Sequence, residues 1–364
     1  MGLRLLEMTY DDLTEAFAER FGKGPFLAGA LYREFYKHLN PRAWQSSIIE
    51  SSPGLKVRLQ TNMVYQPGDI VDEVRRDGVI KFVTELTDGQ RIESVILPME
   101  SHLTVCISSQ AGCRMGCRFC ETARLGLVRQ LKVEEIVGQV YQARKRFGMH
   151  IRNVVFMGMG EPFDNFDAVI QAVRVLSDQR GLDIAQRYIT LSTAGRVDGI
   201  EKLALLGMPH LKLAVSLNAP NDALRSRLMP INHTASLDRL QKAVMAFPLK
   251  KGYEVMIAYV LIPGINDGEE CARQLTRWLE PLKAKVNLIP FNPGTAAPYR
   301  APTESELKCF RQRLIDLKVN VQKRASRGKD LMAACGQLGQ AAGRSRRLLQ
   351  SESHRRGWAT RDRR

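Results

Sequence analysis

With 364 residues, the chain is long enough to bury one large hydrophobic core and a small accessory unit. Its formal net charge of +16 favours a polyanionic partner, above all nucleic acid. No apolar run approaches the roughly 18 residues of a membrane-spanning helix, and the first residues, MGLRLLEMTYDD, contain neither a secretory apolar region nor a myristoylation signal. We therefore expect a cytoplasmic protein without a membrane partner.

Residues 1–98 predict a small helical unit followed by a β-hairpin. Up to residue 62, apolar side chains recur at helical spacing on both sides of the GKGP break at 22–25. Residues 78–97 then hold two β-rich runs around Asp88 and Gly89, a dipeptide that favours a hairpin turn. We assign residues 1–98 to an accessory domain.

Beyond the hairpin, strands and helices alternate. Six short apolar runs have the composition of parallel strands that are covered on both faces: 104–109, 153–158, 188–193, 211–217, 255–262 and 286–291. Amphipathic segments such as 132–147 lie between them. Because parallel strands need crossovers, residues 99–339 predict an α/β fold, a partial parallel (β/α)6 barrel with its chemistry at the C-terminal strand ends. The Arg-rich tail at 340–364 is predicted to be disordered.

Three cysteines, Cys113, Cys117 and Cys120, lie in the stretch SSQAGCRMGCRFCETARLG, just after the first predicted barrel strand. Structural zinc sites and ferredoxin-type clusters take four protein ligands, so C-x3-C-x2-C would leave one iron of a [4Fe–4S] cluster without a protein ligand. An open iron can bind the amino and carboxylate groups of S-adenosylmethionine (SAM) and deliver an electron to its sulfonium. The alternatives are a zinc site completed by His102 or Cys106, and thiols that are simply buried.

Small or polar residues follow several predicted strands, where a barrel would gather them at one end. Gly158 and Gly160 would let the backbone approach a ligand, and Glu161 could receive the ammonium group of SAM. A dinucleotide-binding fingerprint is weak, because Phe163 replaces its third glycine. Further candidates for one pocket rim, each of which alone also fits a cap or turn residue, are Ser192, Ser216, Asn218 and Asn292.

Several short motifs accompany the three cysteines. They are GMGEP (158–162), LSTAG (191–195), SLNAP (216–220), RSRLMPIN (225–232), PGIND (263–267), VNLIPFNP (286–293) and AACGQL (333–338), together with Cys106 and Cys335. On these motifs the chain, from about residue 14 to about residue 339, resembles the RlmN/Cfr family of radical SAM RNA methyltransferases. The resemblance implies a radical SAM fold, a [4Fe–4S] cluster on the three cysteines, and SAM contacts at Gly160, Glu161, Ser192, Ser216, Leu217, Asn218 and Asn292.

The resemblance also implies roles for two more thiols and a carboxylate. One SAM molecule would methylate Cys335, and a second would be cleaved at the cluster, so that the 5′-deoxyadenosyl radical removes hydrogen from the S-methyl group. The new radical would add to an adenine carbon, Glu93 would accept the ring proton, and Cys106 would attack the Cys335 sulfur as the methylated base leaves. From the residues alone, Cys106 and Cys335 also fit buried thiols, as Cys271 and Cys309 do. Glu93 alone fits a solvated hairpin carboxylate.

The implied substrate is RNA, namely large-subunit rRNA with tRNA as a second target, contacted by residues 1–98. C2 of adenine is favoured over C8, although Asn218 and the stretch 121–123 depart from the usual family residues near the cofactor and base pocket. An electron donor such as flavodoxin or ferredoxin is implied, and we expect a monomer. Two other functions stay open: a radical SAM activase acting on a protein, which has no use for Cys335, and a non-catalytic zinc-containing RNA-binding protein.

Overall fold

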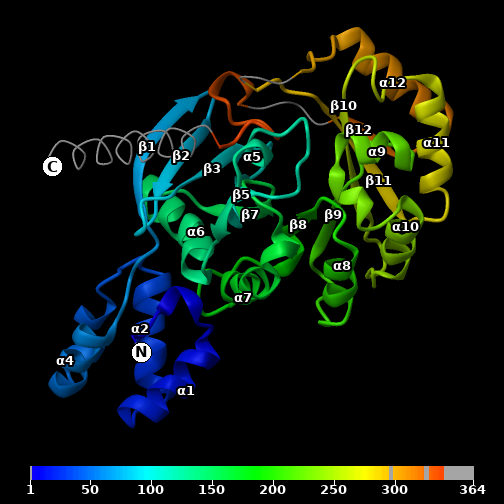
Figure 1. The fold of residues 1–364 in the computed structure, drawn as a ribbon. Helices are drawn as coiled ribbons and strands as arrows, with labels where there is room; N and C mark the ends of the chain where they lie inside the picture. The colour runs from blue at the N-terminus through cyan, green and yellow to red at the C-terminus, as the bar shows by residue number, and fades with distance from the viewer. Residues whose placement is uncertain (1, 295–297, 324–327, 340–364) are drawn as a thin grey trace, which may run out of the picture.

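A ten-stranded sheet organises the chain in the computed structural model, which describes residues 2–294, 298–323 and 328–339 (Figure 1). The strand order is β1-β2-β3-β4-β7-β8-β9-β10-β11-β12. The sheet is open, because β1 and β12 lie at its two edges and do not pair with each other. The tail predicted at 340–364 lies outside the described residues.

The central strands are parallel and follow the six predicted runs. They are β4 (Leu103–Cys106), β7 (Ile151–Phe156), β8 (Ile189–Thr193), β9 (Lys212–Ser216), β10 (Val255–Leu261) and β11 (Ala284–Pro290). A further short parallel strand, β12 (Val321–Lys323), pairs with β11 and was not predicted. The parallel order and the open edges confirm the predicted α/β partial barrel.

Helices connect these strands. They are α6 (Val133–Phe147), α7 (Phe166–Ser177), α8 (Val197–Ala204), α9 (Asp222–Leu228), α10 (Leu237–Ala246), α11 (Glu269–Leu279) and α12 (Glu304–Asp316). Among the described residues, no helix is long and apolar enough to cross a membrane.

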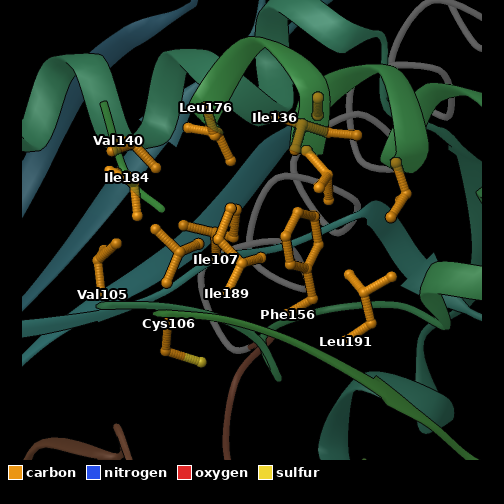
Figure 2. Close-up of a cluster of buried hydrophobic side chains, with 14 of the residues drawn as sticks. Val105, Cys106, Ile107, Ile136, Val140, Phe156, Leu176, Ile184, Ile189 and Leu191 are labelled. Atoms are coloured by element: carbon orange, nitrogen blue, oxygen red, sulfur yellow. The ribbon is translucent and has the colours of Figure 1, made fainter. Parts of the chain in front are cut away.

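The hydrophobic core lies between the sheet and its outer helices. Figure 2 shows Val140 of α6 and Leu176 of α7 directed toward side chains such as Val105 and Ile189 of the strands. Successive strand residues point to opposite faces, so Cys106, the neighbour of Val105, points away from this helical layer. The residues that alternate with the core therefore face the concave side of the sheet.

The N-terminal helices form the predicted helical unit at one end of the molecule, shown in blue in Figure 1: α1 (Tyr10–Phe21), α2 (Pro25–Tyr36), α3 (Ser47–Glu50) and α4 (Pro53–Asn62). Gly22, with φ of +62°, ends α1, and Pro25 starts α2, which explains the break between them. The Phe35 ring stacks on Tyr141 of α6 with ring centroids 4.9 Å apart. This aromatic contact fixes the helical unit on the outer layer.

The predicted hairpin consists of β2 (Val79–Glu85) and β3 (Arg91–Pro98), and β3 pairs antiparallel with β4. The hairpin therefore continues the barrel sheet. An additional strand, β1 (Asp69–Arg76), pairs with β2. Its sequence, DIVDEVRR, is mostly charged and largely exposed, so it carried no apolar signal for a strand.

Candidate active site

A cavity of about 1060 Å³, its opening to solvent included, lies where the parallel strands end. Many of the predicted site residues line it: Cys113, Cys117, Cys120, Gly158, Gly160, Glu161, Ser192, Ser216, Asn218 and Cys335. Residues that are far apart in the sequence thus share one pocket, as the barrel topology requires.

A small second sheet holds the three-cysteine loop. Strand β5 (Gln110–Cys113) pairs antiparallel with β6 (Gly126–Gln130), and the short helix α5 (Glu121–Arg124) follows the last cysteine. Gly112 has φ of +81°, and a Cβ there would lie 1.9 Å from the carbonyl oxygen of Gly126, so only glycine fits. The Arg118 amide donates to the Leu228 carbonyl at 3.0 Å, which ties the loop to α9.

Burial raises the pKa of all three loop thiols, that of Cys113 to about 12. Buried thiolates need a cationic partner, and bound metal supplies one because it deprotonates a coordinating thiol. The three thiols line one cavity wall, and within the described ranges no three ligating side chains converge on a position for a single ion. Three thiols around a cavity fit the ligand set that would hold a [4Fe–4S] cluster, and the cluster would supply the electron for SAM cleavage.

The glycine motif after β7 runs close to β5. A Cβ on Gly158 would lie 2.6 Å from the Ile107 carbonyl oxygen, and one on Gly160, with φ of +107°, would lie 2.7 Å from Gln110 Cβ. Both positions therefore need glycine for this close approach. The motif then delivers Glu161 into the cavity wall.

The Glu161 carboxylate joins the ends of two strands. It accepts hydrogen bonds from the Ala194 amide at 2.6 Å and from the Phe163 amide at 3.1 Å. Burial raises the pKa of Glu161 to about 7, although these N–H donors oppose the shift. An ammonium group bound in the cavity would stabilise the carboxylate form, and SAM carries such a group.

The other strand-end residues divide into two groups. Ser192 and Ser216 line the cavity at the ends of β8 and β9, whereas Leu217 is buried in the core and Asn292 donates to the Pro290 carbonyl at 3.0 Å. The structure therefore does not place Leu217 or Asn292 on the cavity wall. The side-chain periodicity explains why: Leu217 lies one residue past the inward Ser216.

Asn218, where the family usually has histidine, is both at the cavity and structurally engaged. Its backbone is left-handed, with φ of +57°, a conformation that asparagine tolerates better than most residues. Its Oδ1 accepts from the Val260 amide at 2.9 Å, and its Nδ2 lies 3.2 Å from Met229 Sδ. The amide thus holds the β9 end against β10, and the cavity floor keeps its shape.

Further polar residues at the site were not predicted, among them Asn287 and Arg225. Asn287 lines the cavity from within β11, between the outward-facing Val286 and Leu288, and a single polar residue in an apolar strand was the available signal. Arg225 of α9 is 1% exposed, and its guanidinium donates to the carbonyls of Ala194, at 2.6 Å, and Ser216, at 3.3 Å.

Arg225 is also bonded to Leu217 O at 3.2 Å and to Asn232 Oδ1 at 2.9 Å. Burial lowers the pKa of Arg225 to about 10, and the thiol of Cys117 acts in the opposite direction. A buried cation thus lies beneath the cysteine loop, where cluster thiolates would offset its charge.

Cys335 reaches the cavity on the segment 328–339, drawn in orange-red beside α5 in Figure 1. The Glu121 amide donates to the Gly336 carbonyl at 2.8 Å, and Thr122 Oγ1 donates to the Leu338 carbonyl at 2.7 Å across 216 positions of sequence. The segment is therefore attached directly behind the last cluster cysteine. Cys335 and the three loop thiols share one cavity as a result.

Glu93 and Cys106 lie on the concave face of β3 and β4 but do not line the cavity. Glu93 is fully buried, with a salt bridge to Lys81, so a solvated hairpin carboxylate was the wrong expectation. Cys106 is 8% exposed and points away from the helical layer (Figure 2). No disulfide joins any of the seven cysteines, all of which the structure describes.

Two other thiols correct the sequence analysis. Cys309 on α12 is exposed and Cys271 on α11 is half-buried, so neither is the fully buried thiol that was expected. Both lie on outer helices and neither lines the cavity. They therefore provide matched controls for Cys335.

The chain matches known proteins over most of its length. Residues 107–275 match the family model of the Radical SAM superfamily. The dual-specificity RNA methyltransferase RlmN of Pelobacter propionicus is 41% identical, with 89% of this chain and 92% of that protein covered. The protein of the same name from Campylobacter lari is 40% identical, with 90% and 96% covered.

A solved structure agrees with these relatives. The crystal structure of a radical SAM methyltransferase from Sphaerobacter thermophilus superimposes with a TM-score of 0.85 at 38% identity, over 93% of this chain and 99% of that one. Radical SAM proteins in general use SAM and a [4Fe–4S] cluster, the groups that the cavity fits. The chain therefore belongs to the RlmN/Cfr family of radical SAM RNA methyltransferases.

Proposed function

We propose that this enzyme methylates C2 of an adenine in RNA by way of a methyl group carried on Cys335. One observation carries the proposal: Cys335 lines the same cavity as Cys113, Cys117 and Cys120, although it comes from the far end of the chain. A cluster enzyme that only generates a radical has no need for this fourth thiol. A methyl carrier must lie beside the cofactor, and Cys335 lines the cavity that the cofactor would occupy.

The cofactors and the side chains of the site would supply different parts of the chemistry. When bound, the cluster and two SAM molecules per turnover supply an electron, a methyl group and a hydrogen-abstracting radical. In the proposal, the Cys335 sulfur receives the methyl group and, after loss of one hydrogen, joins it to the electron-poor ring carbon. Glu93 then takes the ring proton, and Cys106 attacks the Cys335 sulfur to release the methylated base.

The resolving step needs Cys106 and Cys335 to meet. Both are on the concave side of the sheet, since Cys106 points away from the helices and the Cys335 segment contacts Lys81 and Glu93 on that side. Cys106 does not line the cavity. We infer that the part of segment 328–339 around Cys335 shifts toward β4 before the disulfide forms, while Met332 and Gly339 stay bonded to Lys81 and Glu93.

The cavity residues would hold SAM. In the proposal, Glu161 binds the ammonium group, Gly160 leaves room for the backbone to approach it, and Ser192, Ser216 and Asn218 supply polar contacts from the other wall. Leu217 and Asn292 would not contact SAM and would act only by fixing the positions of the neighbouring cavity residues. Asn218 in place of the usual histidine changes the polarity of this wall and leaves the strand-end geometry in place.

RNA would bind across the basic surface and the helical unit, with residues 1–98 as the accessory domain, 99–339 as the core and 340–364 as a basic tail. Phe26, at the start of α2, is 74% exposed, and Arg20 and Arg33 are exposed on the same unit. An exposed aromatic ring among cations suits stacked bases and phosphates. The name dual-specificity, borne by relatives, supports rRNA and tRNA as two substrates. An electron donor such as flavodoxin or ferredoxin, a monomer and a cytoplasmic location complete the proposal.

Nucleoside mass spectrometry tests the reaction. Protein reconstituted anaerobically with iron and sulfide is incubated with SAM, a reductant and either rRNA or tRNA, and the RNA is digested. We expect 2-methyladenosine. Detection of 8-methyladenosine instead would reassign the carbon atom, and the absence of both would refute the activity.

Two cysteine variants test the carrier. Cys335→Ala should still assemble the cluster but give no methylated RNA, whereas Cys309→Ala, an exposed thiol on α12, should behave as wild type. A Cys335→Ala protein that still modified a substrate would favour a radical SAM activase. Colourless reconstituted protein that holds zinc and never cleaves SAM would favour a non-catalytic RNA-binding protein.

A further inference from the structure

Lys81 is a buried cation in the middle of strand β2. It is 7% exposed, and its neighbours Ile80 and Phe82 belong to the hydrophobic core, where the Phe82 ring contacts Phe147 at the end of α6, with centroids 5.6 Å apart. The strand alternation sends Lys81 to the opposite, concave face. A buried ammonium group is costly unless it is paired, so its partners indicate its role.

Lys81 has two such partners. Its Nζ lies 2.8 Å from Glu93 Oε2 and donates to the Met332 carbonyl at 3.0 Å. The register explains the first contact: Lys81 pairs with Val95, two residues from Glu93, so both charged side chains are on the same face of adjacent strands. The second contact reaches the segment that carries Cys335.

The Lys81–Glu93 pair holds that segment at both ends. Lys81 contacts Met332 before Cys335, and the Gly339 amide donates to Glu93 Oε2 at 3.1 Å after it. Because the two side chains are bonded to each other, the pair closes a ring around the part of the chain that carries Cys335. Glu93, the proposed base, and Cys335, the proposed methyl carrier, are thereby held at a defined position relative to each other.

We propose that Lys81 is a positioning residue of the methyl transfer, which fixes the Glu93 side chain through their salt bridge and anchors the Cys335 segment beside it. The inference rests on the proposed function, because it takes Glu93 as the proton acceptor and Cys335 as the carrier. In the RNA–protein adduct, the ring proton would move to a Glu93 oxygen, the C–H electron pair would stay in the ring, and the unpaired electron of the adduct would pass to the oxidised cluster. The salt bridge to Lys81 and the hydrogen bond from the Gly339 amide fix the orientation of this carboxylate.

The test compares Lys81→Met with Lys81→Arg, which keeps the charge, and with Arg91→Met. Arg91 bonds to Glu85 at 2.8 Å across the same two strands, at the exposed end of the hairpin. Lys81→Met should still methylate Cys335 and cleave SAM, but the rate of adduct release should fall about 100-fold, the lower range for loss of a general base. Lys81→Arg should recover most of that rate. Arg91→Met, assayed with saturating RNA so that any contribution of Arg91 to RNA binding does not enter, should release the adduct at the wild-type rate.

The step that each variant slows separates a positioning role from general damage. Lys81→Met should slow adduct release while methyl transfer to Cys335 and SAM cleavage keep their wild-type rates, and Glu93→Gln should accumulate the adduct. A Lys81→Met enzyme in which all three steps slow to the same degree would overturn the inference.

Hydrogen exchange tests the anchoring without any cofactor. Amides of residues 328–339 should exchange about tenfold faster in Lys81→Met than in wild type or Arg91→Met, because one charge-assisted hydrogen bond is lost. If Lys81→Met does not fold, the double variant Lys81→Met/Glu93→Gln, which leaves no unbalanced charge, should show the same fast exchange. Unchanged exchange in both variants overturns the anchoring.

The two levels of the proposal fail in different ways. If wild-type enzyme forms neither methyl-Cys335 nor an adduct, the proposed function is wrong and the assignment of Lys81 falls with it. If wild-type enzyme forms both and Lys81→Met releases the adduct at the wild-type rate, the inference on Lys81 alone is wrong.

Discussion

The cavity has two walls that are encoded differently. The cluster wall, residues 110–130, is continuous in the sequence and displays its chemistry in the spacing of three cysteines. The segment wall consists of residues 328–339, which reach the cavity through Cys335, Gly336 and Leu338, and of strands β2 and β3, which support this segment without lining the cavity. Its bond between Glu93 and Gly339 spans 246 positions. A local motif therefore specifies which cofactor binds. Long-range contacts specify where Cys335, the proposed methyl carrier, lies relative to that cofactor.

The walls also differ in how their charges are balanced. In the segment wall, the Lys81 ammonium and the Glu93 carboxylate neutralise each other. In the cluster wall and at the residues next to it, burial raises the pKa of three thiols and of Glu161, and the buried Arg225 bonds to carbonyl and amide oxygens. The cluster wall therefore depends on bound cofactors for its electrostatics, and the segment wall is complete in the protein alone.

The largest expected effect is on the cluster wall. Cys117→Ala removes one of the three proposed cluster ligands, so the protein should lose its iron–sulfur absorption and all release of 5′-deoxyadenosine. Hydrogen exchange of residues 328–339 in cofactor-free protein should stay as in wild type, because the segment wall is held by other contacts. Iron analysis and mass spectrometry measure both.

A control variant sharpens this prediction. Cys271→Ala removes a half-buried thiol on α11, outside the cavity, and should retain the full iron content. Wild-type iron content in Cys117→Ala would show that the cluster is bound elsewhere and would break the comparison of the two walls.

The next effect is on the support beneath the cluster wall. Arg225→Met leaves the carbonyls of Ala194 and Ser216 and the Asn232 amide oxygen without their donor. We expect a loss of about 3–5 kcal/mol in the free energy of unfolding, measured by urea denaturation, since buried acceptors lose a charged partner. Arg227→Met, an exposed residue of the same helix, should change it by less than about 0.5 kcal/mol. If both variants lost the same free energy of unfolding, the loss would come from damage to helix α9 and not from the missing bonds of the Arg225 guanidinium.

Stability against pH separates the walls further. The pKa of Glu161 is raised from 4.5 to about 7 by burial, so its contribution is fully present below pH 4.5 and is lost as the pH rises through 7. Between pH 5 and pH 8, cofactor-free wild-type protein should therefore lose about 3 kcal/mol of unfolding free energy relative to Glu161→Gln. Denaturant titrations along this pH range measure the difference. Glu201→Gln, an exposed carboxyl on α8, should follow the wild-type slope, and a Glu161→Gln curve parallel to wild type would contradict the burial argument.

The same contrast explains how far the sequence alone could go. Hydrophobic runs predicted six parallel strands and the hairpin, because buried strands need continuous apolar side chains. The three cysteines and the GMGEP motif predicted the cluster wall, because ligand spacing is a local property. Strand β1 was not predicted, because a strand at a sheet edge can consist mostly of charged residues and then has no apolar pattern.

The segment wall could not be predicted from the sequence, for a physical reason. Lys81 and Glu93 look like hairpin surface residues until 328–339 covers them, and no local pattern shows that a chain segment more than 200 positions away does so. The family resemblance identified Glu93 and Cys335 but not Lys81. Asn287 and Arg225 were not predicted for a related reason. Only the assembled sheet shows that the Asn287 side chain points into the cavity and that helix α9 places Arg225 under the cysteine loop.

The smallest expected effect concerns the joint between the walls. Thr122 follows the cluster cysteines, and its Oγ1 donates to the Leu338 carbonyl at 2.7 Å, so Thr122→Val keeps the shape but removes that bond. We expect residues 328–339 to exchange about fivefold faster, which corresponds to about 1 kcal/mol for one neutral hydrogen bond, with little change in global stability. Thr61→Val, which removes an exposed bond to Val57 in α4, should leave that exchange unchanged. If Thr122→Val also left it unchanged, the segment wall would be held by Lys81 and Glu93 without help from the cluster wall, and the two walls could move independently during methyl transfer.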